Sequence, residues 1–280
     1  MLLSRFEYRT AKTVREATSL WSEVPGSKYL AGGTDLLPQM RARHHVARVV
    51  DLKRIPELNE IRKTADGGFS IGSVVTMAAV AAHPEISKKY VALIQCIEEV
   101  GAWPLRNRAT LAGNVCNASP AADTSIALLA LEASVGIDGP KGARKVALSE
   151  FFKGPGKTVL EGGEIVTEIL LPATTADWAG KYLRLSRRKG MDLATVGVLV
   201  TRANGKGPHR VALAAVAPTP LRVRQAEEVL DGDGLTASTI QKAAQLATVA
   251  CSPITDVRGT AEYRREMVGV LTARGLNALA

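Results

Sequence analysis

Up to Pro172, hydrophobic positions recur with both the helical and the strand period, so the sequence predicts a mixture of helices and strands. Thr13 and Glu16 have the spacing of a capping box, which predicts a helix that runs to about Trp21. Further helices are predicted after Thr76, over 86–101 and over 122–133. Short apolar runs predict strands at 28–31, 47–52, 69–71 and 164–171.

The pattern changes after Pro172. Strands are predicted at 181–188, 194–201 and 210–216, and helices at 222–230, 236–248 and 259–274. The turn residues of Ala203-Asn-Gly-Lys-Gly207 predict a hairpin between the second and third of these strands. We therefore predict an α+β protein with two domains, 1–175 and 176–280, and a linker at 173–177.

Composition agrees with this division, because 280 residues fit two domains of about 150 residues each. Cys96, Cys116 and Cys251 are too few and too dispersed for a disulfide framework, a zinc ribbon or an iron–sulfur cluster of the chain's own. No apolar stretch approaches the roughly 18 residues of a membrane span, and the N-terminus has no secretory signal. We predict a cytoplasmic chain with no membrane span and no metal site.

The net charge is positive, since 36 Lys and Arg residues exceed 27 Asp and Glu residues by 9. Such a balance is found in proteins that bind nucleic acids, anionic ligands or acidic partner proteins. Aromatic residues make up only 4% of the chain and do not alternate with basic ones as in RNA-binding modules. The pattern favours a generally basic surface over a nucleic-acid-binding module, which we retain as an alternative.

The first segment with candidate chemistry is Tyr29-Leu-Ala-Gly-Gly-Thr-Asp-Leu36, where a short strand ends in paired glycines. Glycine permits positive φ and close approach of the backbone to a ligand, and successive N–H groups there can bind an anion. Asp35 fits poorly beside a phosphate, so its carboxylate must turn away or accept hydrogen bonds from the loop. A structural turn is the alternative interpretation of this segment.

A second segment of small polar residues follows about 80 residues later, at Thr110 to Asn114, and predicts another loop that exposes its backbone. Ser119 and Pro120 then lead into the predicted helix near Ala122, whose N-terminus favours anions. Asp123 either caps that helix or accepts hydrogen bonds from ligand hydroxyls, such as those of a sugar or ribityl chain. Together the two loops predict a diphosphate held from two sides.

Neither GxGxxG nor GxxxxGK[ST] occurs in the chain, which argues against the common dinucleotide-binding and ATPase folds. Five segments instead carry a specific resemblance, AGGTDLLPQMR, LRNRATLAGNVCNASPAAD, FFKGPGKT, GEIVTEILLP and YLRLSRRKGMDLATVGV. With them the chain resembles, over almost its full length, the FAD-binding medium subunit of the molybdenum hydroxylases. This family includes xanthine dehydrogenase, molybdenum–copper carbon monoxide dehydrogenase and 4-hydroxybenzoyl-CoA reductase.

The resemblance implies a two-subdomain FAD-binding domain of the vanillyl-alcohol-oxidase (PCMH) type, with subdomains at about 1–58 and 59–175, before a C-terminal domain with a small antiparallel sheet and helices. It implies no catalytic acid or base and places FAD between the subdomains. It implies these cofactor-binding residues: Tyr29, Leu30, Ala31, Gly32, Gly33, Thr34, Asp35, Leu36, Val100, Thr110, Leu111, Ala112, Gly113, Asn114, Ser119, Asp123, Val166 and Arg184.

Some positions depart from the family pattern or have a simpler reading. Ala112 replaces a glycine of the commonest second motif, and the chain lacks the cysteine-rich insertion that carries an extra cluster in some members. We expect Cys116 and Trp103 to be packing residues. We hypothesise that backbone N–H groups or Arg184 supply donors at the N1/O2 edge of the flavin, where negative charge develops on reduction.

The resemblance further implies that a large partner subunit carries molybdopterin and a small one carries two [2Fe–2S] clusters, in a heterotrimer or its dimer. This chain then passes electrons from the clusters through FAD to an acceptor that the sequence does not identify. Two alternatives share the fold. One is a self-sufficient FAD-dependent reductase similar to the enzyme that acts on UDP-N-acetylenolpyruvylglucosamine, and the other is an assembly subunit without FAD.

Overall fold

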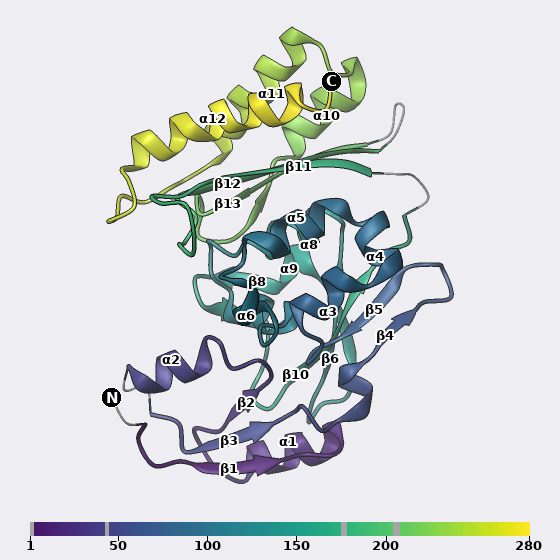
Figure 1. The fold of residues 1–280 in the computed structure, drawn as a ribbon, viewed down its shortest axis with the longest axis vertical. Coiled ribbons are helices and arrows are strands. Elements are labelled where there is room, and N and C mark those ends of the chain that lie inside the picture. The colour runs from purple at the N-terminus through teal and green to yellow at the C-terminus, as the bar shows by residue number, and fades with distance from the viewer. Residues whose placement is uncertain (1–2, 43–44, 175–177, 204–207) are drawn as a thin grey trace.

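The computed structural model describes residues 3–42, 45–174, 178–203 and 208–280. These residues form three main sheets and a two-stranded ribbon, which confirms the α+β class (Figure 1). We call residues 3–59 the N-terminal unit, 60–174 the middle unit and 178–280 the C-terminal unit. Figure 1 shows them stacked along the long axis of the molecule, with the N-terminal unit at the bottom and the C-terminal unit at the top.

The N-terminal unit is a small parallel sheet with strand order β1-β3-β2. The central strand β3 is buried at all four positions, as expected for a strand flanked on both sides. Thr13 caps the following helix as predicted, because its hydroxyl accepts a hydrogen bond from the Glu16 N–H at 3.1 Å. The elements are β1 Glu7–Thr10, α1 Val14–Ser22, β2 Lys28–Leu30, α2 Leu36–Arg41, β3 Arg48–Asp51 and the 3₁₀-helix η1 Pro56–Asn59.

The middle unit is an antiparallel sheet with strand order β4-β5-β10-β6-β7, packed against helices. Its strands are β4 Ile61–Lys63, β5 Phe69–Gly72, β6 Ser134–Asp138, β7 Arg144–Ala147 and β10 Ile165–Leu171, with the ribbon β8 Phe152–Gly154 and β9 Lys157–Thr158. Its helices are α3 Met77–Ala82, α4 Pro84–Lys89, α5 Val91–Glu99, α6 Trp103–Arg106, α7 Leu111–Asn117, α8 Asp123–Ala130 and α9 Leu148–Phe151.

Helix α8 links the middle unit to the C-terminal unit. All of its residues are buried, because it packs on α5 and also on strands of the C-terminal sheet. A helix buried on every side needs no polar face, which explains the nearly uniform apolar run that predicted it. The helix nevertheless begins with an acidic residue, Asp123, and this buried carboxyl group becomes important below.

The single helix predicted over 86–101 is wrong, because α4 and α5 are separate helices that meet at Tyr90. The Tyr90 ring packs edge-on against Phe69, and its hydroxyl donates to the Pro172 carbonyl at 2.8 Å. These contacts join Tyr90 to segments far away in the sequence, so the helical period alone could not reveal the break.

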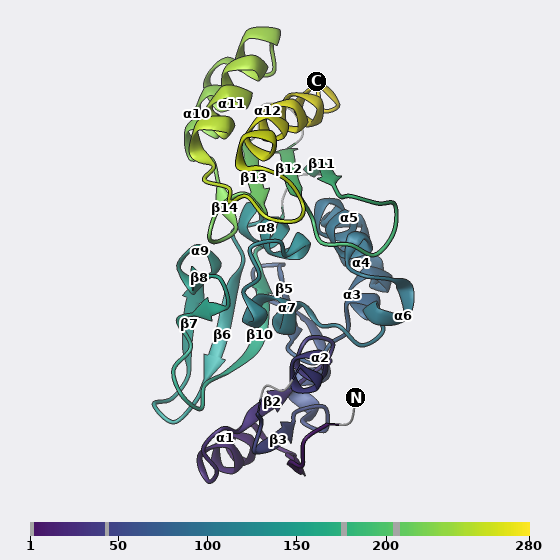
Figure 2. The same cartoon turned by 90° about the vertical axis from the view of Figure 1, so that its left-hand side faces the viewer.

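The C-terminal unit is an antiparallel sheet with strand order β11-β12-β13-β14. Figure 2 shows helices α10 to α12 on one side of this sheet, with α5 and α8 of the middle unit on the other side. The elements are β11 Trp178–Leu185, β12 Val196–Ala203, β13 His209–Ala214, β14 Leu221–Arg222, α10 Arg224–Asp233, α11 Ala237–Ala250 and α12 Ala261–Asn277. The predicted hairpin turn at 203–207 and the linker at 173–177 fall largely outside the described residues.

A group of ion pairs joins the middle and C-terminal units at Glu132, the second residue after α8. The Glu132 carboxylate lies 2.8 Å from Arg222, 3.4 Å from Arg224 and 3.6 Å from Arg210. Its backbone has a φ of 56°, in the left-handed region that favours glycine. One strained acidic residue therefore pairs with arginines from three positions of the C-terminal unit.

Candidate functional site

A cavity of about 640 Å³ lies where the three units meet. Its volume is within the range of about 300–1,000 Å³ that is typical of sites for small molecules and cofactors. All of the predicted cofactor-binding residues line it except Leu111 and Arg184. The N-terminal unit contributes 29–36, the middle unit contributes most residues of 109–123 together with 164–166, and the C-terminal unit contributes part of the β11–β12 connection.

The first loop leaves β2 at Leu30 and needs both of its glycines. A Cβ atom on Gly32 would lie 2.0 Å from the Arg108 carbonyl oxygen, and Gly33 has a φ of 77°. Among the described residues, no protein acceptor is found for the backbone N–H groups of residues 32–36. Because these residues line the cavity, their N–H groups are donors that an anionic ligand can use.

Asp35, the acidic residue of this loop, has a hydrogen-bond partner in the protein. Asn117 donates its amide N–H to the Asp35 carboxylate at 3.3 Å, and Gln39 donates to the Asn117 amide oxygen at 3.4 Å. The Asp35 carboxylate is thus engaged by α7 of the middle unit. These contacts, with the backbone approach at Gly32, bring the two predicted loops to the same side of the cavity.

The second segment is not the exposed loop that the sequence predicts, because residues 111–117 form helix α7. Thr110 caps this helix and accepts a hydrogen bond from the Gly113 N–H at 2.9 Å. Leu111 points into the core with 1% of its surface exposed, which explains why it does not line the cavity. Apolar residues at helical spacing therefore prevail over the small polar residues between them.

Asn114 is the polar side chain that α7 presents to the cavity. Its amide oxygen accepts a hydrogen bond from the buried Thr124 hydroxyl at 2.7 Å. This contact fixes the orientation of the amide and leaves its NH₂ group as a donor on the cavity side. A donor at this place suits an anionic group that also reaches the N–H groups of the first loop.

At another part of the cavity, Asp123 combines burial with contacts to the C-terminal unit. The Tyr182 hydroxyl donates to Asp123 Oδ1 at 2.5 Å, and Arg184 Nε lies 3.5 Å from the same oxygen. Burial raises the pKa of Asp123, while the Tyr182 hydrogen bond and the Arg184 charge lower it. No protein hydrogen bond to Oδ2 is found in the described part of the chain, so this oxygen is available to a ligand hydroxyl.

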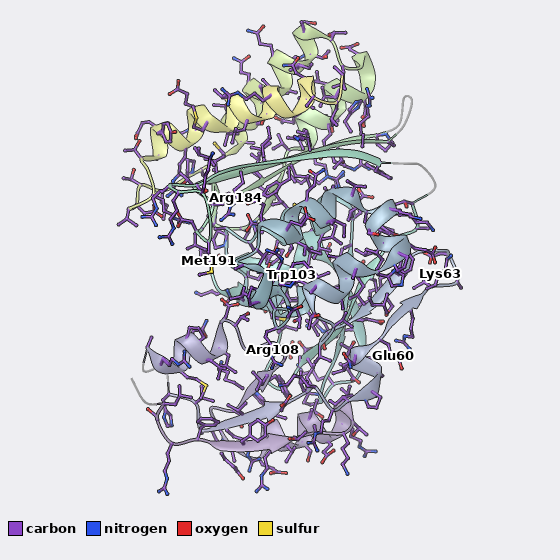
Figure 3. The ribbon with its side chains drawn as sticks, viewed as in Figure 1. Glu60, Lys63, Trp103, Arg108, Arg184 and Met191 are labelled. Atoms are coloured by element: carbon purple, nitrogen blue, oxygen red, sulfur yellow. The ribbon has the colours of Figure 1, made fainter. Side chains whose placement is uncertain are left out.

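Arg184 itself stays outside the cavity lining. Its guanidinium pairs with Glu99 at 2.8 Å and also donates to the Asp192 carbonyl. Figure 3 shows Arg184 on the C-terminal sheet, with Met191 nearer to the middle unit. Arg184 therefore contacts the site through two lining residues, at the Asp123 carboxylate and the Asp192 carbonyl.

Several cavity residues escaped the sequence analysis. Ser73 follows β5 and is 98% buried, with its N–H bonded to the Thr167 carbonyl where β10 shifts register against β6. Ser73 lines the cavity, and its buried hydroxyl has no protein partner among the described residues. Buried hydroxyls are usually hydrogen-bonded, so a polar atom of a ligand in the cavity would supply the partner that this one lacks. A polar residue directly after a buried strand is the signal that could have revealed it.

The C-terminal unit also brings Met191 and Leu193 to the edge of the cavity. Their side chains remain 56% and 58% exposed, so the cavity has an apolar, accessible border on this side. Both residues belong to the segment YLRLSRRKGMDLATVGV that carries the family resemblance, but neither was among the predicted cofactor-binding residues. Trp103, labelled in Figure 3 and expected in the core, is instead 68% exposed. The Arg106 guanidinium lies 5.8 Å from the centre of its ring.

The lining suits a dinucleotide with a flat ring system. Unpaired N–H groups and the Asn114 amide offer donors to a diphosphate, while Val100, Met77 and Val166 supply apolar surface. Burial raises the pKa of Cys116 to about 12, so its thiol is protonated at neutral pH. Among the described residues, no cluster of three His, Cys, Asp or Glu side chains could hold a metal ion, and no helix is long and apolar enough to cross a membrane.

Comparison with known families gives two matches that together span most of the chain. Residues 4–174 match the FAD-binding domain found in molybdopterin dehydrogenases. Residues 181–279 match the C-terminal domain of carbon monoxide dehydrogenase flavoproteins.

Individual relatives agree with these matches. The medium chain of carbon monoxide dehydrogenase from Hydrogenophaga pseudoflava is 34% identical, over 99% of this chain and 98% of its own. A xanthine dehydrogenase FAD-binding subunit from Escherichia coli O157:H7 is 30% identical, over 95% of this chain and 93% of its own. A solved structure of the Hydrogenophaga enzyme superposes with a TM-score of 0.94 at 36% identity, covering 99% and 98% of the two chains.

Fold, cavity and comparisons define an FAD-binding subunit of a multi-subunit oxidoreductase. The chain belongs to the family of FAD-binding medium subunits of the molybdenum hydroxylases. The predicted family, fold class and cofactor are thereby confirmed.

Proposed function

We propose that this chain holds FAD in the cavity between its three units and carries electrons from the iron–sulfur clusters of a partner subunit to an external acceptor. The observation that carries the proposal is the single cavity that unites nearly all of the residues implied by the resemblance. FAD, when bound, supplies redox chemistry that exchanges electrons singly or in pairs. The protein supplies binding, orientation and charge.

In this proposal the diphosphate lies between the first loop and Asn114, where backbone and side-chain donors meet. Asp123 Oδ2 accepts a hydrogen bond from a hydroxyl of the ribityl chain, and Ser73 meets a polar atom elsewhere along the cofactor. The isoalloxazine lies on the side bordered by Met191 and Leu193, because their exposure leaves an approach for electron partners. Arg184 acts on this side through Asp123. The division into 1–175 and 176–280, with subdomains meeting near residue 58, belongs to the same proposal.

The names of the relatives support the proposed assembly. The chain matches medium subunits of enzymes named for carbon monoxide and xanthine, and one solved relative is a copper- and molybdenum-containing carbon monoxide dehydrogenase. We infer a large partner that carries molybdopterin and a small partner that carries two [2Fe–2S] clusters, as a heterotrimer or its dimer in the cytoplasm. Chemistry on the organic substrate then takes place on the large subunit.

The test is to purify the chain alone and with co-expressed partners, record the visible spectrum and identify the cofactor released by acid. We expect a flavin spectrum and release of FAD rather than FMN. FMN carries a single phosphate and would leave part of the donors for the diphosphate without an acceptor. A colourless chain that takes up no FAD in either preparation contradicts the proposal and favours an assembly subunit without FAD. Flavin in a chain that never joins a molybdenum subunit favours the self-sufficient reductase.

A further inference from the structure

A tyrosine of the C-terminal unit reaches the acid at the edge of the cavity. Tyr182 lies on β11, and its hydroxyl donates to Asp123 Oδ1 at the start of α8. Residues two apart on a strand share a face, so Tyr182 and Arg184 approach Asp123 together. Neither residue lines the cavity itself, and the Asp123 carboxylate is the lining group that both of them contact.

The surroundings of Tyr182 hold its hydroxyl in place. On the neighbouring strand, Gly197 leaves the space that the phenol needs, since a Cβ atom there would lie 2.9 Å from the Tyr182 hydroxyl. On the other side, Gln95 of α5 accepts from the Tyr182 N–H at 2.8 Å and donates to the Gly180 carbonyl at 3.1 Å. Strand β11 is thus clamped to the middle unit beside the hydroxyl.

We propose that Tyr182 is a positioning residue for the flavin site, which keeps the Asp123 carboxylate ionised and turns its second oxygen toward the cofactor. This inference rests on the proposed binding of FAD in the cavity. It assigns the C-terminal unit a part in cofactor binding that does not depend on direct contact.

The charge balance around Asp123 explains why a hydroxyl donor matters there. Asp123 is only 8% exposed, and burial disfavours its charged form. The titratable and charged groups that face it are Tyr182 and Arg184 from β11, and Cys96 and Glu99 from α5. The negative charge of Glu99 opposes ionisation of Asp123, and Glu99 also competes with Asp123 for the Arg184 guanidinium. The Tyr182 hydroxyl donates to Asp123 alone, so it stabilises the Asp123 carboxylate without such competition.

The test measures the Kd of FAD for the full chain, with its co-purified partners, as a function of pH. In the wild type, affinity should be full while Asp123 is ionised and should fall as it becomes protonated. Tyr182→Phe removes a hydrogen bond to the charged form, so the pKa of Asp123 rises and the loss begins at higher pH. Where the wild type only begins to lose affinity, we expect the variant to bind FAD roughly threefold or more weakly.

Tyr90→Phe is the matched control, because it removes another buried tyrosine hydroxyl whose acceptor is the Pro172 carbonyl. Its pH profile should follow that of the wild type. Asp123→Asn keeps an acceptor for Tyr182 but cannot titrate, so its profile should be flat and should not change when Tyr182→Phe is added.

Two results overturn the inference alone, a wild-type profile in Tyr182→Phe and a wild-type pH dependence in Asp123→Asn. If Tyr182→Phe fails to fold, the pH dependence of FAD binding by Asp123→Asn still tests the inference. A wild-type chain without FAD affinity, alone or with partners, instead overturns the proposed site, and the inference falls with it.

Discussion

The two glycine-containing segments look alike in the sequence but reach the cavity in different ways. Residues 31–35 form an irregular loop between β2 and α2, and no acceptor in the described part of the chain is found for the N–H groups of residues 32–36. Residues 111–117 instead form a helix that Thr110 caps and whose apolar side lies in the core. The first segment therefore presents its backbone, and the second presents one side chain, Asn114. A glycine beside a predicted binding site can serve either arrangement, and only the packing around it shows which one.

The strongest test of this contrast exchanges glycine for alanine in each segment. Gly32→Ala forces a Cβ atom to within 2.0 Å of the Arg108 carbonyl, so the first loop must move away from the middle unit. We expect FAD affinity to fall by about 10- to 100-fold, as overpacking against backbone implies. Gly113→Ala meets only the Thr110 hydroxyl, at 2.9 Å, and should stay within about threefold of the wild type. Titration of the apoprotein with FAD measures both, and equal losses would contradict the contrast.

A charge change tests the side-chain contribution of the second segment. Asn114→Asp keeps the acceptor for Thr124 but replaces the amide donor with a negative carboxylate next to the proposed diphosphate. We expect roughly tenfold weaker FAD binding from the lost donor and the repulsion. Asn59→Asp adds the same charge outside the cavity lining and serves as the control. If both variants bind FAD equally well, Asn114 does not face the diphosphate.

Ser73→Ala separates ligand contacts from packing in the middle unit. The lost hydroxyl has no partner in the part of the chain that the structure describes, so the variant should keep the stability of the wild type and bind FAD about three- to fivefold more weakly. Ser70 lies on β5, the strand that precedes Ser73, and its hydroxyl donates to Glu168. Ser70→Ala should therefore alter stability but not FAD affinity. Thermal melting and FAD titration of the two variants distinguish these effects. If Ser73→Ala lowered the stability but left FAD affinity unchanged, Ser73 would have no part in binding.

The smallest effect is expected at Cys116, which lines the cavity beside Asn117. Since its pKa is raised to about 12, the reactive thiolate is scarce at pH 8 and appears only in strongly alkaline solution. Iodoacetamide should therefore modify Cys116 slowly in the native chain and rapidly after unfolding, as mass spectrometry can follow. Cys116→Ala should leave FAD affinity unchanged within about twofold. Rapid alkylation of the native chain would assign this thiol a more active role.

Local signals in the sequence were sufficient where the chemistry is itself local. Thr13 and Thr76 both cap the helices that they were predicted to begin. The paired glycines predicted a loop at positions where a side chain would clash or strain the backbone. The family motifs then gave the fold and the cofactor. These features depend on neighbouring residues, so the linear order of the chain contains them.

Features that depend on distant contacts were missed or wrong. Helix α7 was predicted as a loop because Gly, Asn and Thr have poor helix propensity, yet Leu111 and Val115 anchor it in the core. Trp103 was expected in the core but lies on the surface, where the Arg106 guanidinium is 5.8 Å from the centre of its ring. Ser73 joins the cavity only through strand pairing, which the order of residues along the chain does not display.

Glu132 has a consequence for how the units could part or combine. A glycine there would relieve the cost of the left-handed backbone, about 1 kcal/mol, and would make the middle unit more stable by itself. In the full chain the same change would leave Arg210, Arg222 and Arg224 without their common acid, so like charges would repel at the joint. The residue that best suits an independent flavin domain is thus not the one that best suits a joined chain. Glutamate at this position therefore favours the chain in which the middle and C-terminal units are joined over a separate middle unit.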